Sequence, residues 1–143
     1  MKKIANTAFI YAIIAMICGV IYREGSKFLG ITEPITWSLT HTHFFVLGMF
    51  FFLIILLLEK SFHLTKEKKF KSFYITYNIG LVLTGIMLWI RGIFDITKNA
   101  PVMYDKMISG ISGIGHILLG IGIIIFFIIL KKQVKEEKNK AAQ

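Results

Sequence analysis

Four long apolar runs dominate the sequence and limit what the chain can fold into. They cover roughly residues 4–22, 36–58, 73–90 and 107–130. The length of each run matches the roughly 20 residues that an α-helix needs to cross a hydrocarbon core about 30 Å thick. The mean hydropathy is +0.68 and 55% of the residues are hydrophobic, against about 45–50% in soluble domains. The sequence therefore predicts an all-α membrane protein, an up-down-up-down bundle of four transmembrane helices formed by residues 1–143 as a single domain.

Lysine and arginine are unevenly divided between the two ends of this predicted bundle. Most lie beside the N-terminus, in the loop at 59–72 and in the charged tail at 131–143, whereas the loops at 23–35 and 91–106 hold fewer. Positive residues concentrate on the cytoplasmic side of membrane proteins. We therefore expect both termini to be cytoplasmic. The same clustering accounts for the net charge of +9 without a basic surface of the kind that binds nucleic acid.

Three histidines are expected in the outer half of the membrane. A rise of 1.5 Å per residue, counted from the outer ends of the runs, places His41, His43 and His116 about 8, 10 and 13 Å deep. An imidazole taken out of water without a partner costs roughly 2–7 kcal/mol. Ionisable residues inside membrane spans therefore suggest function by default, and these three histidines are the leading candidates for a site.

His41 and His43 point to different sides of the second predicted helix. Residues two apart on an α-helix are separated by roughly 200°, so the two side chains are poorly placed to hold one metal ion together. His43 lies nearer the depth of His116, whereas His41 shares its face with Gly48. Periodicity leaves the choice open, and the small-residue face, which favours close packing, gives His41 a narrow preference.

His116 stands in the stretch SGISGIGHILLGIG, with Gly113 and Gly120 on its own face. The missing side chains leave a flat recess beside the imidazole, into which a porphyrin or another helix would fit. Neutral imidazole is a common axial ligand of haem iron, and helical bundles usually build cofactor sites in their cores. The first hypothesis is therefore haem b held by His116 and by either His41 or His43.

Further polar residues surround this layer and keep alternatives open. Arg23 and Arg91 at the outer rim are suited to neutralising haem propionates, because guanidinium binds carboxylate in a bidentate manner. A zinc or copper site would instead combine His116 and one of the other two histidines with Glu24. In a third interpretation the protein is a structural or accessory subunit without a cofactor, whose polar groups join helices or relay protons. The sequence contains no P-loop and no nucleophile with a base, so we do not predict an enzyme.

The order of four stretches resembles one bacterial family. The stretches are YREGSKF, HTHFFVLGMFFFLIILLLEK, YNIGLVLTGIMLWIRG and SGISGIGHILLGIG. Together they look like a family of small four-span membrane proteins, mainly from Gram-positive bacteria, that is described as a domain of unknown function. The HTH stretch in the second span is the most specific part. The resemblance implies a bacterial plasma membrane and four helices, but no activity.

A weaker similarity concerns the pairing of a histidine in an early span with one in a late span. This arrangement is similar to that in four-helix cytochromes, haem A synthases and the haem-copper oxidase core. The chain lacks the further histidines of an oxidase copper centre, so we do not expect it to reduce oxygen alone. As partners we expect the lipid bilayer together with a second copy of the chain or a larger membrane redox complex.

Overall fold

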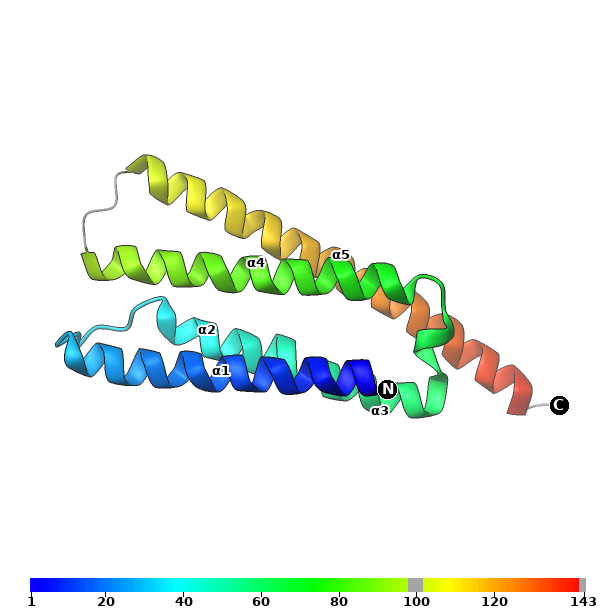
Figure 1. Ribbon diagram of the computed structural model, residues 1–143. Helices are drawn as coiled ribbons and strands as arrows, with labels where there is room; N and C mark the ends of the chain where they lie inside the picture. Colours follow the sequence, from blue (N-terminus) through cyan, green and yellow to red (C-terminus); the bar gives the residue numbers. More distant parts are fainter. Residues whose placement is uncertain (98–101, 142–143) are drawn as a thin grey trace.

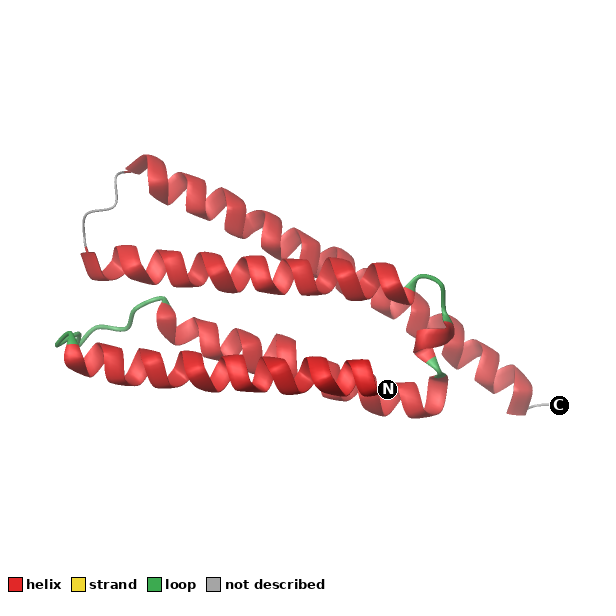
Figure 2. Cartoon of the chain, in the orientation of Figure 1, coloured by secondary structure: helices red, strands yellow, loops and turns green. Residues whose placement is uncertain are grey.

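The structure is a computed structural model that describes residues 1–97 and 102–141. Its elements are α1 (Lys2–Phe28), α2 (Trp37–His43), the π-helix η1 (Phe44–Phe50), α3 (Phe51–Phe62), the short 3₁₀ helix η2 (Leu64–Lys66), α4 (Phe70–Thr97) and α5 (Val102–Ala141). Because α2, η1 and α3 follow one another without a break, they form a single long helix. The described residues contain helices and loops and no strand (Figure 2).

The four helices confirm the predicted four-helix fold, and each is long and apolar enough to cross a membrane. Their ends extend beyond the apolar runs. The predicted loop at 91–106 is mostly helical, because α4 continues to Thr97 and α5 begins at Val102. At the other end, α5 continues through the charged residues after Leu130 as far as Ala141. Apolarity marks the stretch that suits a lipid core, whereas a helix can continue wherever its exposed side chains are solvated.

The helices are arranged as two packed pairs, and both termini lie at the same end of the bundle (Figure 1). α1 packs along the helix formed by α2, η1 and α3, while α4 packs along α5. In the described residues, no Cα atom of α1 comes within 8 Å of α4 or α5. Long side chains bridge this separation instead: the Tyr11 hydroxyl donates to Asn78 Oδ1 at 2.7 Å, and Trp89 Nε1 donates to Cys18 Sγ at 3.4 Å.

Two aromatic side chains set the register between the second helix and α4. Trp37 lies against Gly92 and Phe44 against Gly85, so closely that a Cβ atom at either glycine would overlap the aromatic ring. The two aromatic residues are seven positions apart, and so are the two glycines. Because the helices run antiparallel, both contacts form at one register only.

The α4–α5 pair also depends on glycine, here through close approach of the two backbones. A Cβ atom at Gly80 would lie 2.7 Å from the Leu119 nitrogen and 2.9 Å from the Gly115 oxygen. Small residues allow such approach where lipid provides no hydrophobic drive for helix association. From this contact toward its first residues, α5 moves away from α4 (Figure 1). The two helices are therefore further apart in the half of the bundle away from the termini, which we call the distal half.

Candidate functional site

His43 and His116 lie next to each other in the distal half. Their ring centroids are 6.4 Å apart and their planes are nearly perpendicular, at 88°. His43 is half-buried at the end of α2, and His116 is exposed on α5. The structure therefore brings together one histidine of the second span and the histidine of the fourth.

Each of these imidazoles is oriented by a hydrogen bond to its own helix. His43 Nδ1 donates to the Leu39 carbonyl oxygen and His116 Nδ1 donates to the Ser112 carbonyl oxygen, both at 2.8 Å. A carbonyl oxygen only accepts, so Nδ1 carries the proton in both rings and a neutral ring keeps its lone pair on Nε2. Histidines that bind metals usually donate from the other ring nitrogen in this way, which fixes the tautomer and the ring orientation. In both neutral rings, Nε2 is therefore the nitrogen that could accept a hydrogen bond or bind a metal ion.

The two histidines span a gap between α5 and the first part of the second helix. In the described residues, neither α2 nor η1 brings a Cα atom within 8 Å of α5. A groove of about 200 Å³ beside His43 is lined by Thr42, His43, Val46 and Leu47. On the face of α5 that carries His116, a Cβ atom added at Gly113 or Gly120 would have no neighbour within 4 Å. Open space therefore adjoins both histidines.

A π-helix begins directly after His43 and runs through η1. π-helical turns are rare and often occur at functional sites. Their wider turn changes the direction of the side chains that follow, compared with an α-helix. The position of η1 is therefore a further sign, independent of the histidines, that this part of the second helix is specialised.

His41 faces a different helix from His43, as the predicted angular separation requires. Its Cβ and Cγ atoms pack on Gly19 of α1, each 3.8 Å from where a Cβ of that glycine would lie. His41 Nδ1 is buried and has no hydrogen-bond partner in the described part of the chain. The ring beside His116 is therefore that of His43, although the small-residue face gave the narrow preference to His41. That preference rested on Gly48, and the ring of Tyr11 occupies the space beside this glycine.

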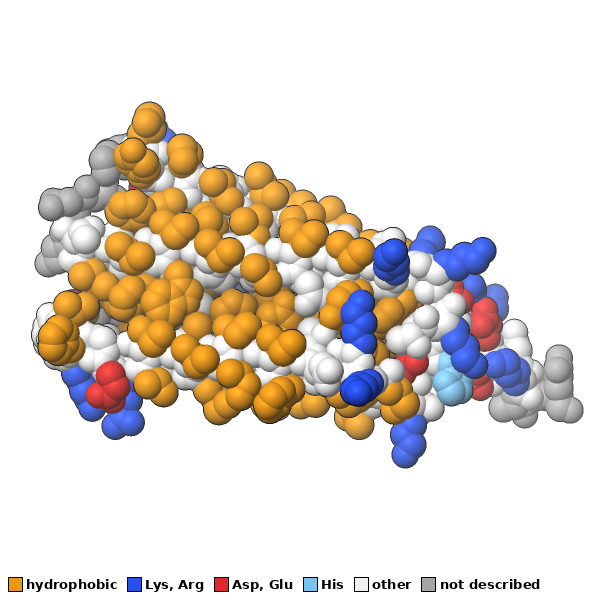
Figure 3. All heavy atoms as spheres, in the orientation of Figure 1, with side chains coloured by type: hydrophobic (Ala, Val, Ile, Leu, Met, Phe, Trp, Pro, Cys, Tyr) orange, Lys and Arg blue, Asp and Glu red, His pale blue; other side chains and the backbone are white. Residues whose placement is uncertain are grey.

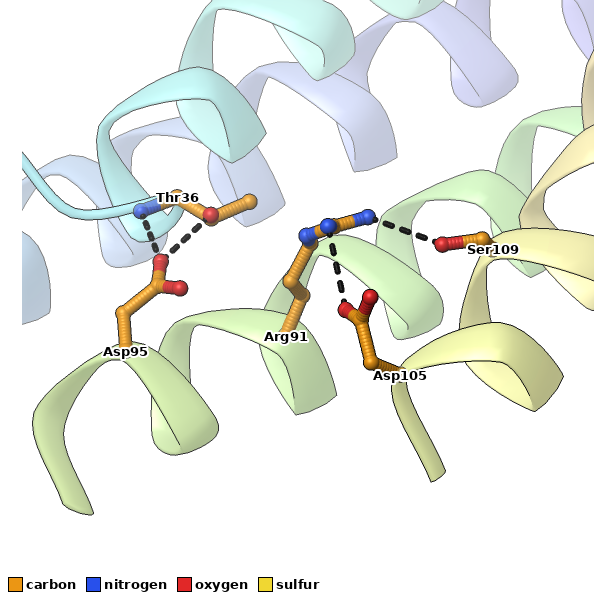
Figure 4. A network of polar contacts seen from close by, with 5 residues as sticks. All are labelled: Thr36, Arg91, Asp95, Asp105 and Ser109. Carbon is orange, nitrogen blue, oxygen red and sulfur yellow. Dashed lines mark hydrogen bonds and ion pairs between the residues drawn. The ribbon is translucent and has the colours of Figure 1, made fainter. Parts of the chain in front are cut away.

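The distal rim contains a set of polar contacts that links three helices (Figure 4). The Arg91 guanidinium donates to Ser109 Oγ at 3.2 Å and to Asp105 Oδ1 at 3.1 Å, which joins α4 to the first turns of α5. Asp95 accepts from the backbone nitrogen of Thr36 at 2.8 Å and from its hydroxyl, which joins α4 to the start of α2. Arg91 thus has protein partners, and its expected role with propionates remains a prediction.

Arg23 and Glu24 lie together on α1, at a different part of the rim. Arg23 Nε is 3.6 Å from Glu24 Oε1, and Lys27 Nζ is 3.4 Å from the same oxygen. All three side chains are largely exposed. Residues 1–97 and 102–141 contain no group of three or more His, Cys, Asp or Glu side chains arranged to hold a metal ion. The structure therefore does not assemble the set of His41 or His43, His116 and Glu24 around one point.

The four long apolar helices give the chain the architecture of a multi-pass α-helical membrane protein. The family described as "Protein of unknown function (DUF2871)" matches residues 1–133. The chain belongs to this family, as the resemblance of its four stretches predicted. Searches of curated proteins and of solved structures found no match.

Sequence reasoning overlooked the residues that orient the two histidines. Leu39 and Ser112 act through their backbone carbonyls, so their side chains give no signal. Their spacing from the histidines does give a signal. A histidine inside a helix can donate Nδ1–H to the carbonyl four residues earlier, and both histidines have such a residue in their own helix. Sequence reasoning also missed Asp105 as the partner of Arg91, since it lies in the predicted outer loop.

Proposed function

We propose that this protein binds haem b in its distal half through Nε2 of His43 and of His116. The observation that carries the proposal is the geometry of this pair, with ring centroids 6.4 Å apart and both Nδ1 atoms engaged by carbonyls. Two imidazoles on opposite sides of one metal ion have ring centres about 6 Å apart, since each metal–nitrogen bond is about 2 Å long. The separation of the two rings fits that arrangement.

Haem suits this site better than an isolated metal ion because it needs fewer protein ligands. A porphyrin supplies four nitrogen ligands itself, so two axial imidazoles complete the coordination of the iron. Structural zinc sites use four protein ligands and catalytic sites three, and no such set was found among the described residues. The open space beside Gly113 and Gly120 supports the same choice, because a flat ring needs room on one helix face.

The family relationship and the charge distribution suggest where the protein works. We place it in a bacterial plasma membrane with both termini in the cytoplasm, so that the histidine pair lies in the outer leaflet. Bound haem would supply one-electron redox chemistry. The chain itself would hold the group, orient its ligands and exclude water with the surrounding apolar helices. Electron transfer, sensing and haem handling all agree with this role, in a dimer or in a larger redox complex.

Reconstitution tests this proposal directly. The full chain, purified in detergent, is titrated with haemin and followed by absorption spectroscopy, and bound haem is then counted per chain. We expect saturation at one haem per chain, with a sharp Soret band and the low-spin spectrum of two imidazole ligands. Failure to take up haemin would contradict the proposal. Zinc or copper bound without a Soret band would favour the non-haem alternative, and a cofactor-free protein would favour an accessory subunit.

A further inference from the structure

A pocket of about 240 Å³ lies at the end of the bundle that holds the termini, between the first turns of α1 and α4. Its lining includes Lys3 and Lys71, next to the buried apolar side chains of Ile4 and Phe70. Lys3 Nζ lies 4.0 Å from the centre of the Tyr74 ring. This cation–π contact holds the ammonium group at the pocket. The pocket thus combines positive charge with an apolar base.

The two lysines keep their charge available to a ligand. The ion pairs of the described residues involve neither Lys3 nor Lys71. Glu67, a carboxylate that lines the pocket, already binds Lys132 Nζ at 2.7 Å and Gln133 Nε2 at 2.9 Å. The free charge at the pocket is therefore positive and complementary to an anion such as a phosphate group.

A shallow apolar groove lies further along α4 and begins one turn beyond Tyr74. It has a volume of about 400 Å³ and is lined by Asn78, Ile79, Val82, Leu83 and Ile86. Lys71, Tyr74 and Asn78 are spaced so that they lie on one face of the helix, and Asn78 Nδ2 donates to the Tyr74 carbonyl oxygen at 2.6 Å. Asn78 therefore connects the two sites, because it shares the face of the pocket residues and forms the near edge of the groove.

This surface changes from charged to apolar in the direction of the membrane. Figure 3 shows apolar side chains over the spanning part of the bundle and a concentration of Lys and Arg side chains toward the end where the N-terminus lies. A phospholipid has the same polarity profile, with a charged headgroup followed by acyl chains. Basic pockets between membrane helices on the cytoplasmic side are suited to anionic headgroups.

We propose that one anionic phospholipid binds here, with its phosphate between Lys3 and Lys71 and an acyl chain along the α4 groove. The proposal depends on the pocket, its unpaired lysines and the adjoining groove. It does not depend on the histidine pair in the distal half. A failure of haem binding would therefore leave it standing.

Isothermal titration of the purified full chain in a neutral detergent tests the proposal. The probes are dioctanoyl phosphatidylglycerol, dioctanoyl phosphatidylcholine and glycerol 3-phosphate. The test variant combines Lys3→Gln with Lys71→Gln. The matched control combines Lys60→Gln with Lys135→Gln, which removes the same charge from exposed lysines at the same end, outside the pocket. Helix content by circular dichroism confirms that both variants fold.

We expect the phosphatidylglycerol to bind the native chain more tightly than the phosphatidylcholine does. The test variant should weaken this binding roughly 10- to 30-fold, while the control stays within about twofold of the native chain. Equal loss in both variants would show a general charge effect of the rim and overturn the site. Glycerol 3-phosphate binding as tightly as the lipid would show that the pocket takes a soluble phosphate, and equal binding of the two lipids would show that headgroup charge is not recognised. Either result would overturn the proposal.

Discussion

His43 and His116 are held at the same level by two neighbouring residues of α4, although, in the part of the chain that the structure describes, α2 and η1 have no Cα atom within 8 Å of α5. Phe44, which follows His43, fills the space at Gly85, and Gly115, which precedes His116, packs against Thr84. α4 is therefore the common support of the pair. Changes in α4 should alter the separation of the two rings without touching either of them.

The three membrane histidines should respond unequally to mutation. His43→Ala and His116→Ala should each weaken haem binding by at least about tenfold, since even loss of an orienting partner of a metal ligand costs that much. His41→Ala should leave the low-spin spectrum nearly unchanged, because His41 packs on Gly19 of α1. Haemin titration of the three variants measures this. Loss of haem in His41→Ala with retention in His43→Ala would reverse the assignment.

Two glycines on the α4–α5 pair should differ sharply in their tolerance of alanine. Gly80→Ala should destabilise the bundle by about 1–3 kcal/mol, because the new Cβ would meet backbone atoms of α5 that cannot move aside. Gly113→Ala, with open space around it, should be neutral or should gain up to about 1 kcal/mol of helix propensity. Reversible unfolding in detergent, followed by circular dichroism, gives both values. Equal losses would show that α5 is not packed as described.

The Arg91–Asp105 ion pair should contribute little to stability by itself. The Arg91 and Asp105 side chains are 43% and 55% exposed, so solvent screens the pair. A double-mutant cycle with Arg91→Ala and Asp105→Ala should give a coupling of about 0.2–1 kcal/mol. Arg91→Lys should restore only part of the loss, since one ammonium does not reproduce the planar guanidinium that reaches both Asp105 and Ser109.

The same variants test whether Arg91 also neutralises a haem propionate. If it does, Arg91→Ala should lower haem affinity or shift the reduction potential in the fraction that remains folded. Unchanged haem content and potential per folded chain would leave Arg91 with its structural contacts alone. Asp105→Ala is the matched control, because it frees Arg91 without removing its charge.

Cysteine labelling should establish the orientation in the membrane. In a Cys18→Ala background, a cysteine in place of the exposed Thr32 should react with an impermeant thiol reagent outside intact cells. One in place of the exposed Ser61 should react only after the cells are opened. Labelling of intact cells at Ser61 but not at Thr32 would invert the topology and move the histidine pair to the inner leaflet.

The contact between Glu67 and α5 should depend on pH. The hydrogen bond from Lys132 holds the pKa of Glu67 below its usual value. A carboxyl whose pKa is lowered by folding stabilises the fold above its unfolded pKa, and this contribution is lost as the pH falls through the lowered pKa. The melting temperature of Glu67→Gln should therefore be below that of the native chain at pH 7, and the difference should shrink on acidification. A difference that is constant with pH would contradict this.

The membrane fold was predictable because apolarity over about 20 residues is a direct requirement of the bilayer. Helix ends were less predictable, as α4 shows by continuing seven residues past the apolar run, to Thr97. Its last turns contain Arg91 and Asp95, which lower the hydropathy but do not break a helix. Partners such as Thr36 for Asp95 depend on the packing of whole helices, which local sequence does not report.

The choice between His41 and His43 shows where sequence reasoning reached its limit. The angular separation of the two residues was sound, and the structure places them against different helices. The small-residue face favoured His41, but the ring of Tyr11 occupies the space at Gly48, and the histidine beside His116 is His43. Depth favoured His43, since it compares residues from two spans without assuming which face is central. Which of the two histidines binds a cofactor stays a prediction.

The matched spacing of Trp37 and Phe44 with Gly92 and Gly85 has a consequence for biogenesis. Spans that enter the membrane one after another meet as preformed helices, and lipid gives them no hydrophobic reason to choose one alignment. The rings of Trp37 and Phe44 select one alignment by shape. A slip of one turn would shift the second helix by about 5.4 Å, and neither ring would then lie against Gly92 or Gly85. The histidine pair can therefore form only once the third and fourth spans have docked, which makes it a product of the last step of assembly.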